Sequence, residues 1–573
     1  MPKIEVYEKS FYDYVGGRIE DDELELLLES AKGELKEHSD GVLKIELNDT
    51  NRPDLWSAPG LARQLRAARG KLPGAYRFLS SAGSALSSEE RVVDVEASVR
   101  DIRPFIAVFA VRGKKVTETM LLDIIEAQET LCRNFGRKRK GIAMGVHREK
   151  LIRYPLRYRG ADPARTRFTP LQSTEEMSLD EILVRHPKGV EYGWIVKGLP
   201  LYPLLEDAEG GVLSFPPVIN SARIGGVTVG DDRLFVDMTG PDLDILLLAV
   251  SIAACDFQDM GFQVHPVKVR YPYDTKHGRE ITTPYYFQRE VRCPLADAGK
   301  LLGVPVAAAE ALDCLKKAGL DASHRGDDIV VQPPPYRNDF LHPVDVVEEI
   351  MIGRGMGSFE PVWPRDFTIG RLSAGERFSR LVVDVMDGLG YQEMLYLYLG
   401  ADDDLVRKMR HNDSDGAGQG MIRVANPMTE SFETLRDSII PSLLSTEAVS
   451  GNAAYPHRIF EVGKVCLRSA EENYGSITRT HLGALVSSRE ASFNDVRAHL
   501  AALLYYLGRE HALRPADDPR FIPGRCAVVQ ASEGAAVTRL GVIGELHPEV
   551  LGNFGVQSPC AALELDLEAV MRG

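Results

Sequence analysis

Cysteine is scarce in this 573-residue sequence: there are seven, at positions 132, 255, 293, 314, 466, 526 and 560, and no two form a Cys-x-x-Cys pair. An odd, scattered set argues against a disulfide framework and a zinc site, and it predicts reduced core thiols. Long apolar runs are also missing, since the most apolar stretch, residues 245–255, is about half the length of a membrane span. No apolar signal segment follows the first methionine, so we expect a cytoplasmic protein with no membrane partner.

The chain has no excess of positive charge. Its 68 basic and 83 acidic residues give a formal net charge of −15, which argues against polyanion binding over the whole surface but not against a local basic patch. The 51 glycines and 33 prolines are too few for a low-complexity chain, and 44% hydrophobic residues support folded cores. At roughly 150 residues per domain, the length predicts about four domains.

A divergent internal repeat organises the first and third of these domains. Near the N-terminus, a predicted helix over residues 21–37 precedes the strand VLKIEL and a Pro-rich turn that enters another helix. The same order recurs after residue 290, where the turn residues 336–340 fall opposite residues 51–55. We therefore predict two related modules, over about residues 1–90 and 276–362.

Mixed strands and helices fill the rest of the chain. Residues 91–275 contain strand-like IAVFAVRG and RLFVDMT and a buried helix over 242–260. Residues 363–573 begin with a helix over 373–389 and contain the strand RIFEVGKVCL. No Gly-rich strand-to-helix fingerprint is present, so an antiparallel sheet with flanking helices is favoured over a Rossmann sheet. The predicted fold class is α+β, in several domains.

One segment is strongly basic. Residues 133–159 hold ten Arg and Lys side chains, among them Arg137, Lys138, Arg139 and Lys140, against the single acid Glu149. Such a run in an acidic protein favours contact with phosphates. The alternative is an ordinary solvated surface.

Four acidic residues gather where the second repeat enters its helix. Pro343 suits the first helical position, and from there Asp345, Glu348 and Glu349 project from one face, with Asp339 in the preceding turn. Oxygen ligands alone favour a hard cation. The alternative is that acids in a first turn stabilise the helix dipole. At equal offsets the first copy has Gly60, Arg63 and Gln64, which favours a task specific to the second copy.

A stiff loop follows residue 204. In the sequence SFPPVIN, adjacent prolines lie between Ser214 with Phe215 and Asn220, and Leu205 lies upstream. Mixed polar and apolar residues on a rigid loop suit a small-ligand pocket. The alternative is a capped Pro-rich turn. No Ser-His-Asp or Cys-His arrangement follows from the spacing.

Five ordered motifs carry a family resemblance: LNDTNRPDLWSAPGLARQLR, GRKRKGIAMGVH, EYGWIVKG with VLSFPPVINS, PPPYRNDFLHPVDVVEEI, and GLGYQEM followed by NPMTESFETLRDSIIPSLL and RIFEVGKV. They resemble the β subunit of phenylalanine–tRNA ligase in its shorter archaeal and eukaryotic form. The resemblance implies an α2β2 enzyme that uses ATP to activate phenylalanine and esterifies it to tRNA(Phe). It implies that the α subunit performs synthesis, and that residues 363–573 are an inactive, class II-like assembly domain, in which we find no third class II motif for ATP.

The resemblance also implies the site residues. Family Mg²⁺ ligands match Asp339, Asp345, Glu348 and Glu349, the last of which is usually Asp. An editing site for tyrosyl-tRNA falls in residues 91–275, near Leu205, Ser214, Phe215 and Asn220. The basic residues Arg137, Lys138, Arg139 and Lys140 are then expected to contact tRNA. Two other hypotheses are a free-standing mischarged-tRNA deacylase and a non-catalytic RNA-binding scaffold.

Overall fold

The computed structural model describes residues 2–72, 74, 76–79, 91–411, 420–533 and 536–572. The chain forms two compact units, Met1–Val362 and Trp363–Gly573, which are described separately. All seven cysteines are free and six are buried, which confirms the prediction of core thiols. No helix in the described ranges is long and apolar enough to cross a membrane. The predicted domain boundary at residue 90 lies outside the described residues.

The first module of unit 1 is a three-stranded sheet with helices packed on it. The sheet has the order β1-β3-β2 and is antiparallel. Its elements are β1 (Lys3–Tyr7), α1 (Glu8–Val15), α2 (Asp21–Leu28), β2 (Gly33–Ser39), β3 (Val42–Leu47) and α3 (Ala58–Ala68).

The predicted helix over residues 21–37 is wrong in its second half. Helix α2 and a short 3-10 turn end at Ala31, and Lys32 then takes a left-handed conformation with φ of 50°. The segment after it has one apolar residue, Leu35, and no helical face to bury, so it forms β2 beside β3 instead.

The second module repeats the first. Its antiparallel sheet has the order β16-β18-β17, again with the last strand in the middle. Two helices separate its first two strands and one helix follows the turn, as in the first module. Its elements are β16 (Val291–Pro294), α8 (Leu295–Leu302), α9 (Ala308–Lys317), β17 (Asp321–Arg325), β18 (Asp328–Gln332) and α10 (Pro343–Arg354).

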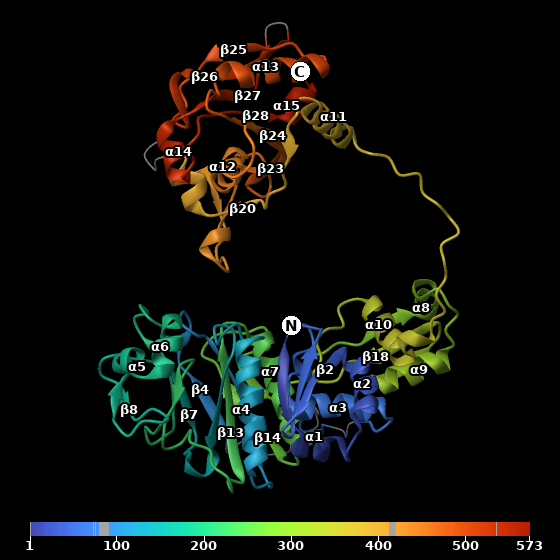
Figure 1. Ribbon diagram of the computed structural model, residues 1–573. Coiled ribbons are helices and arrows are strands. Elements are labelled where there is room, and N and C mark those ends of the chain that lie inside the picture. The colour runs from blue at the N-terminus through green and yellow to red at the C-terminus, as the bar shows by residue number, and fades with distance from the viewer. Residues whose placement is uncertain are drawn as a thin grey trace. The chain divides into compact units, whose positions relative to one another are not determined.

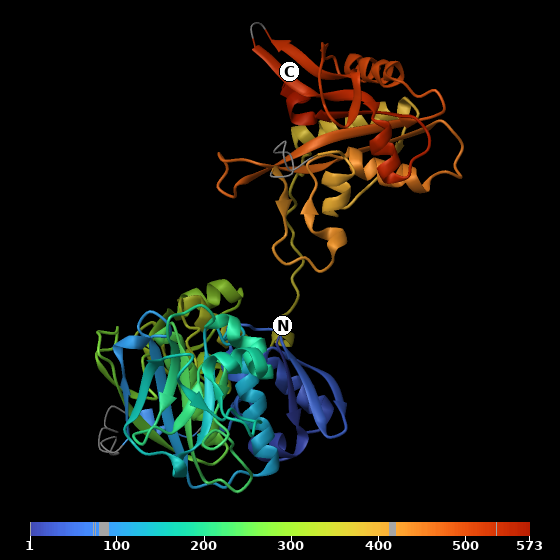
Figure 2. The same cartoon turned by 90° about the vertical axis from the view of Figure 1, so that its left-hand side faces the viewer.

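A ten-stranded mixed sheet lies between the two modules in sequence. Helix α7, buried along most of its length, packs on β5, β13 and β14, and α4 contacts both β6 and the first module (Figures 1 and 2). The strands are β4 (Val92–Val95), β5 (Phe105–Arg112), β6 (Ala143–Arg148), β7 (Leu156–Ala161), β10 (Tyr202–Glu206), β11 (Val212–Phe215), β12 (Ile219–Asn220), β13 (Arg233–Gly240), β14 (Gln263–Arg270) and β15 (Glu280–Thr283). The helices are α4 (Glu118–Arg133), α5 (Leu179–Arg185), α6 (Pro187–Tyr192) and α7 (Leu243–Asp259), and β8 (Arg167–Phe168) pairs with β9 (Met177–Ser178).

Unit 2 contains a seven-stranded sheet of order β19-β23-β24-β28-β27-β26-β25, antiparallel except for the β19–β23 pair. Its strands are β19 (Gln392–Glu393), β23 (His457–Arg468), β24 (Ser476–Ser487), β25 (Ala512–Pro515), β26 (Phe521–Glu533), β27 (Ala536–Leu546) and β28 (Cys560–Asp566). Its helices are α11 (Ala374–Gly388), α12 (Ile440–Val449), α13 (Phe493–Tyr506), α14 (Pro548–Phe554) and α15 (Leu567–Arg572). A small sheet joins β20 (Leu399–Gly400), β21 (Ile422–Arg423) and β22 (Thr434–Leu435).

Both faces of the seven-stranded sheet are covered. Helices α11, α13 and α15 pack with one face in a single apolar core, and α12 and α14 pack with the other face in a second core. Buried carboxylates on these strands are already paired within the unit: Glu461 lies 2.6 Å from Arg436, and Glu564 lies 2.8 Å from His481.

Candidate functional site

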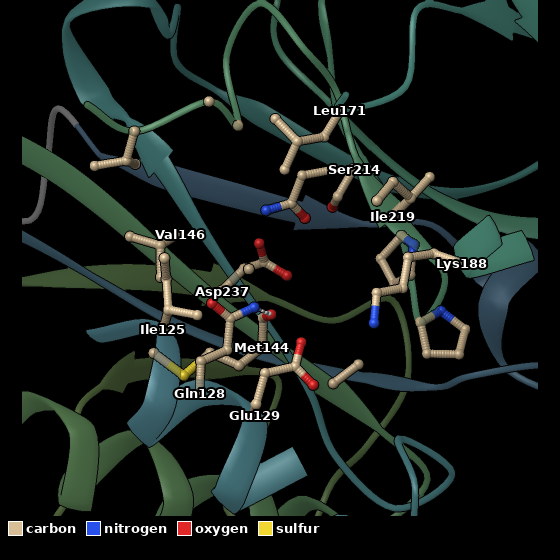
Figure 3. A pocket seen from close by; sticks show the side chains of 18 of the residues that line it. Ile125, Gln128, Glu129, Met144, Val146, Leu171, Lys188, Ser214, Ile219 and Asp237 are labelled. Carbon is tan, nitrogen blue, oxygen red and sulfur yellow. Dashed lines mark hydrogen bonds between the residues drawn. The ribbon is translucent and has the colours of Figure 1, made fainter. Parts of the chain in front are cut away.

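A cavity of about 280 Å³ opens in the domain built on the ten-stranded sheet, the middle domain, among α4, β6 and the β11–β12 hairpin. Figure 3 shows its lining side chains from close by. Much of the wall is apolar, with Leu121, Ile124, Ile125, Met144, Val146, Leu171, Phe215 and Ile219 among its members. Polar side chains also line it, namely Gln128, Glu129, Arg139, Gln172, Lys188, Ser214, Asn220 and Asp237.

The most buried of these polar groups is Asp237. It lies on β13, and its carboxylate points into the cavity (Figure 3). Its Oδ1 lies 2.5 Å from Nε2 of His147 on the neighbouring strand β6, and both residues are almost fully buried. Since 90 positions separate the two residues and only strand pairing brings them together, their spacing in the sequence gave no signal.

Gly145 lies at the point where these polar groups converge. It is the direct partner of Asp237 across the β13–β6 pair. A Cβ atom at this position would overlap Asp237 Oδ1, and it would lie 2.6 Å from His147 Nε2 and 3.2 Å from Asn220 Oδ1. The missing side chain therefore keeps free the space that three polar side chains surround.

Three of the four predicted pocket residues line the cavity. Ser214 and Asn220 are direct partners in the β11–β12 hairpin, and Phe215 follows Ser214. The Ser214 Oγ is buried and has no hydrogen-bond partner among the described residues. The fourth residue, Leu205, pairs with Ser214 from β10 but is buried in the core and does not line the cavity.

Arg139 braces the cavity wall. Its guanidinium donates to Glu129 on α4 at 2.7 Å and to the Val218 carbonyl at 3.1 Å, and it lies 4.1 Å from the centre of the Tyr192 ring. It ends a run of three non-glycine residues with positive φ, Arg137, Lys138 and Arg139. Strain of this kind persists where the surroundings fix the backbone, and it clusters at functional sites.

The rest of the basic run is less free than its sequence suggests. Several of its members pair with acids from other segments, as Lys150 does with Asp232 at 2.6 Å and Arg159 with Glu206 at 2.8 Å. Arg137, Lys138 and Lys140 are exposed near the cavity-lining Arg139. The available positive charge is therefore concentrated at this loop.

The predicted acidic cluster is engaged in three separate ways. Helix α10 begins at Pro343 as predicted, and Asp345 accepts hydrogen bonds from the backbone N–H groups of Leu341 and His342 at 2.6 and 2.7 Å. Asp345 thus forms part of a capping box at the start of the helix. Glu348 pairs instead with Lys32 of the first module at 2.6 Å.

Asp339 and Glu349 meet on one arginine. Arg337 Nη2 lies 2.5 Å from Asp339 Oδ2 and 2.6 Å from Glu349 Oε1. Burial acts to raise the pKa of Asp339, but the charge and hydrogen bonds of Arg337 outweigh it and hold that pKa below its ordinary value. Among the described residues, no three His, Cys, Asp or Glu side chains are grouped to hold a metal ion. In this structure the four carboxylates are divided among three separate contacts.

The first module contains the same arginine clamp. Arg52 donates to Asp54 at 2.9 and 2.8 Å and to Gln64 at 3.3 Å. These three residues stand 285 positions before Arg337, Asp339 and Glu349, so the clamp is part of the shared fold. Gln64 shows that the clamp forms with an amide in place of a carboxylate.

Two segments of the chain match known sequence families. Residues 362–567 match the "Phenylalanyl tRNA synthetase beta chain CLM domain", and residues 291–356 match the "tRNA synthetase B5 domain". The chain is thus a mixed α+β multidomain protein in which a B5 domain precedes a CLM domain.

Full-length relatives are similar from end to end. The chain is 43% identical over 575 residues to the phenylalanine–tRNA ligase β subunit of Borrelia hermsii, and 42% identical over 612 residues to that of Treponema pallidum, with 100% of each chain covered. Among solved structures, it resembles an N-terminal fragment of the phenylalanyl-tRNA synthetase β subunit of Pyrococcus horikoshii. There the TM-score is 0.57 and the identity 34%, over 62% of this chain and 100% of that one. The chain therefore belongs to the family of phenylalanine–tRNA ligase β subunits.

Proposed function

We propose that this subunit proofreads the product of the ligase: it hydrolyses mischarged tyrosyl-tRNA(Phe) in the cavity of the middle domain. The observation that carries the proposal is the convergence of Asp237, His147 and Asn220 on Gly145 at the wall of a largely apolar cavity. Such a site offers an apolar wall for a ring and polar partners for one hydroxyl.

A site of this kind would correct an error that the synthetic step makes, which is the charging of tRNA(Phe) with tyrosine. Tyrosine is phenylalanine with one added hydroxyl, and an apolar synthetic pocket rejects an added hydroxyl only weakly. A second site whose polar groups form hydrogen bonds with that hydroxyl prefers tyrosine over phenylalanine, because phenylalanine would leave the buried polar groups of the site unpaired. Asp237, already bonded to His147 through Oδ1, offers a charged acceptor to the phenol.

Hydrolysis needs water at the ester rather than a protein nucleophile. Water adds to the carbonyl carbon, the bond from that carbon to the ribose oxygen breaks, and the ribose oxygen takes up a proton as tyrosine leaves. Ser214, with an unpartnered Oγ, is the group that we assign to orienting the ester and the water, while Asn220 on the facing strand joins Asp237 at the phenol. The exposed Arg137, Lys138 and Lys140 would hold tRNA phosphates near the cavity.

The remaining parts of the proposal concern the assembled enzyme. Phenylalanine activation with ATP and transfer to tRNA(Phe) would take place on the α subunit of a cytoplasmic α2β2 complex. Unit 2 would serve assembly, in keeping with helices on both faces of its sheet. The family resemblance assigns Mg²⁺ to Asp339, Asp345, Glu348 and Glu349, and no step of the proposed hydrolysis is routed through a metal.

The test is a deacylation assay on the complex assembled with its α subunit. Wild-type enzyme is expected to hydrolyse tyrosyl-tRNA(Phe) and to spare phenylalanyl-tRNA(Phe), and Asn220→Ala is expected to let tyrosyl-tRNA(Phe) accumulate. The β chain alone should not charge tRNA. Equal hydrolysis by wild type and Asn220→Ala would remove the pocket assignment, and charging by the purified β chain would overturn the division of labour.

A further inference from the structure

The basic loop, residues 137–140, has a backbone shape that its own sequence does not favour. Arg137, Lys138 and Arg139 have φ values of 49°, 53° and 67°, in the left-handed region that residues other than glycine rarely adopt in succession. The N–H groups of the loop donate to carbonyls at the end of helix α4 and within the loop, at 2.9 to 3.2 Å. The carbonyls of Arg139 and Lys140 are left over, and they need a donor from another part of the chain.

Arg103, which lies just before β5 and is almost fully buried, supplies that donor. Its Nη1 donates to the Lys140 carbonyl at 3.1 Å, and its Nη2 donates to the Arg139 carbonyl at 3.2 Å. The same guanidinium donates through Nε to the Thr239 hydroxyl on β13 at 2.8 Å. No backbone N–H among the described residues donates to either loop carbonyl. Arg103 therefore joins the basic loop to the strand that carries Asp237, two positions before Thr239.

Arg103 differs from the other buried arginines because all its hydrogen bonds go to uncharged oxygens. Burial lowers the pKa of Arg103 to about 10, so the guanidinium stays charged at neutral pH, and the negative charge of Asp237 acts to raise that pKa. The other buried arginines in the described part of the chain each pair with a carboxylate, and they are Arg52, Arg63, Arg91, Arg337 and Arg436. Burying a charge without a counter-ion is costly, so an apolar side chain would suit this position better if it only filled space.

We propose that Arg103 is a positioning residue for the substrate tRNA, which holds the basic loop in the shape that presents its three exposed basic side chains to phosphates. This inference rests on the proposed hydrolysis of tyrosyl-tRNA(Phe), and it names the group that organises the tRNA contact. The planar guanidinium suits the task, because its rigid fork of N–H donors bonds both loop carbonyls and Thr239 at once, whereas a lysine ammonium is a compact point charge. Its buried positive charge also adds to the attraction of the loop for phosphates.

Limited digestion of the full-length chain with trypsin tests the hold on the loop, because trypsin cuts after Arg and Lys where the backbone can leave its folded shape. Cleavage after residues 137–140, followed by mass spectrometry, should be slow in wild type and at least tenfold faster in Arg103→Met. Arg103→Lys, which keeps the charge without the fork, should lie between them. Arg91→Met is the matched control and should be cleaved as wild type is, since it removes another buried arginine of unit 1 whose partner Glu149 stays paired with Arg112.

Deacylation by the complex assembled with its α subunit separates this role from a purely structural one. Arg103→Met should raise KM for tyrosyl-tRNA(Phe) at least tenfold, keep kcat within threefold of wild type, and make kcat/KM less dependent on salt. Hydrolysis of 3′-O-tyrosyl adenosine, which has no phosphate, should stay within threefold. An equal loss with this small ester, or cleavage of the loop that Arg103→Met leaves unchanged, would overturn the inference. If Arg103→Met does not fold, as judged by circular dichroism, Arg103→Lys takes its place, with an expected change of at least threefold in KM.

Binding of tRNA(Phe) to the full-length chain gives a measurement that does not depend on hydrolysis. The affinity should fall about tenfold in Arg103→Met and stay at the wild-type value in Arg91→Met. Equal affinity of wild type and Arg103→Met would contradict the role of Arg103. If the wild-type complex does not hydrolyse tyrosyl-tRNA(Phe) at all, the proposed function fails, while the trypsin and affinity measurements still decide whether Arg103 holds the loop for tRNA.

Discussion

Asp237 gives the sharpest prediction at the scale of single residues. Asp237→Asn keeps the shape of the side chain and an acceptor for His147 but removes the charge proposed to bind the phenol. Hydrogen bonds to charged groups contribute roughly 1.5–3 kcal/mol, so tyrosyl-tRNA(Phe) hydrolysis should fall about 10- to 100-fold. Single-turnover deacylation rates measure this. Asp232→Asn, at the partly exposed partner of Lys150 directly before the same strand, should change the rate little, and an equal loss in both variants would contradict the assigned role.

The pair of His481 and Glu564 predicts a pH dependence in unit 2. Burial acts to lower the pKa of His481, but the hydrogen bond and charge of Glu564 outweigh it, and the pKa is raised above its ordinary value. A histidine whose folded pKa is raised contributes stability below its unfolded pKa of about 6.5, and this stability is lost as pH rises through the folded pKa.

His481→Gln should therefore reduce the free energy of unfolding of unit 2 more at pH 6 than at pH 9. Chemical denaturation followed by a probe in unit 2 at both values tests this. A loss that is the same at both pH values would show that the histidine acts through packing alone.

At the residue scale, sequence alone could group side chains that lie in one short segment. Ser214, Phe215 and Asn220 belong to a single Pro-containing loop, and the structure places all three at one cavity. Asp237 and His147 were missed because they meet only through the β13–β6 register. For the same reason the basic run looked freer than it is, since the acids that pair with it, such as Asp232 and Glu206, lie on other segments.

At the scale of elements, the stability of helix α10 can distinguish a capping role of Asp345 from a metal-binding role. Asp345→Ala removes the acceptor for two backbone N–H groups, and loss of such a cap costs about 1 kcal/mol. We expect this loss of stability to be the same in EDTA and in Mg²⁺, as measured by thermal unfolding of the β chain. A larger loss in Mg²⁺ than in EDTA would assign Asp345 to a bound ion.

The first residues of helices α10 and α11 could be predicted from the sequence, but the last residue of helix α2 could not. Pro343 and Ser373 mark helix starts by local chemistry, and α10 and α11 begin at and directly after them. The end of α2 depends instead on pairing of the following segment with β3, which a helical pattern does not reveal. The arginine clamp could be anticipated only in part: the repeat aligned its residues, while the contacts needed the fold.

At the scale of the whole molecule, the proofreading and the assembly that we propose should be separable. Unit 1 is compact by itself and contains the entire cavity. A fragment of residues 1–358 should fold and hydrolyse tyrosyl-tRNA(Phe) without residues 363–573, although its rate should fall more steeply with added salt if tRNA is held mainly by the basic loop. Circular dichroism and deacylation assays check both points. A folded but inactive fragment would show that the cavity needs further parts of the enzyme.

The contacts between the two repeated modules have a consequence for how the domain between them can be lost or acquired. Lys32 pairs with Glu348 at 2.6 Å, and the Arg63 guanidinium lies 4.1 Å from the centre of the Tyr336 ring. The polypeptide thus leaves one module, forms the domain of the ten-stranded sheet, and enters a second module that contacts the first. An in-frame deletion of the domain would leave its two flanks joined as neighbours, so a lineage could discard the proofreading that we propose for this domain in a single genetic event without rebuilding the rest of the subunit.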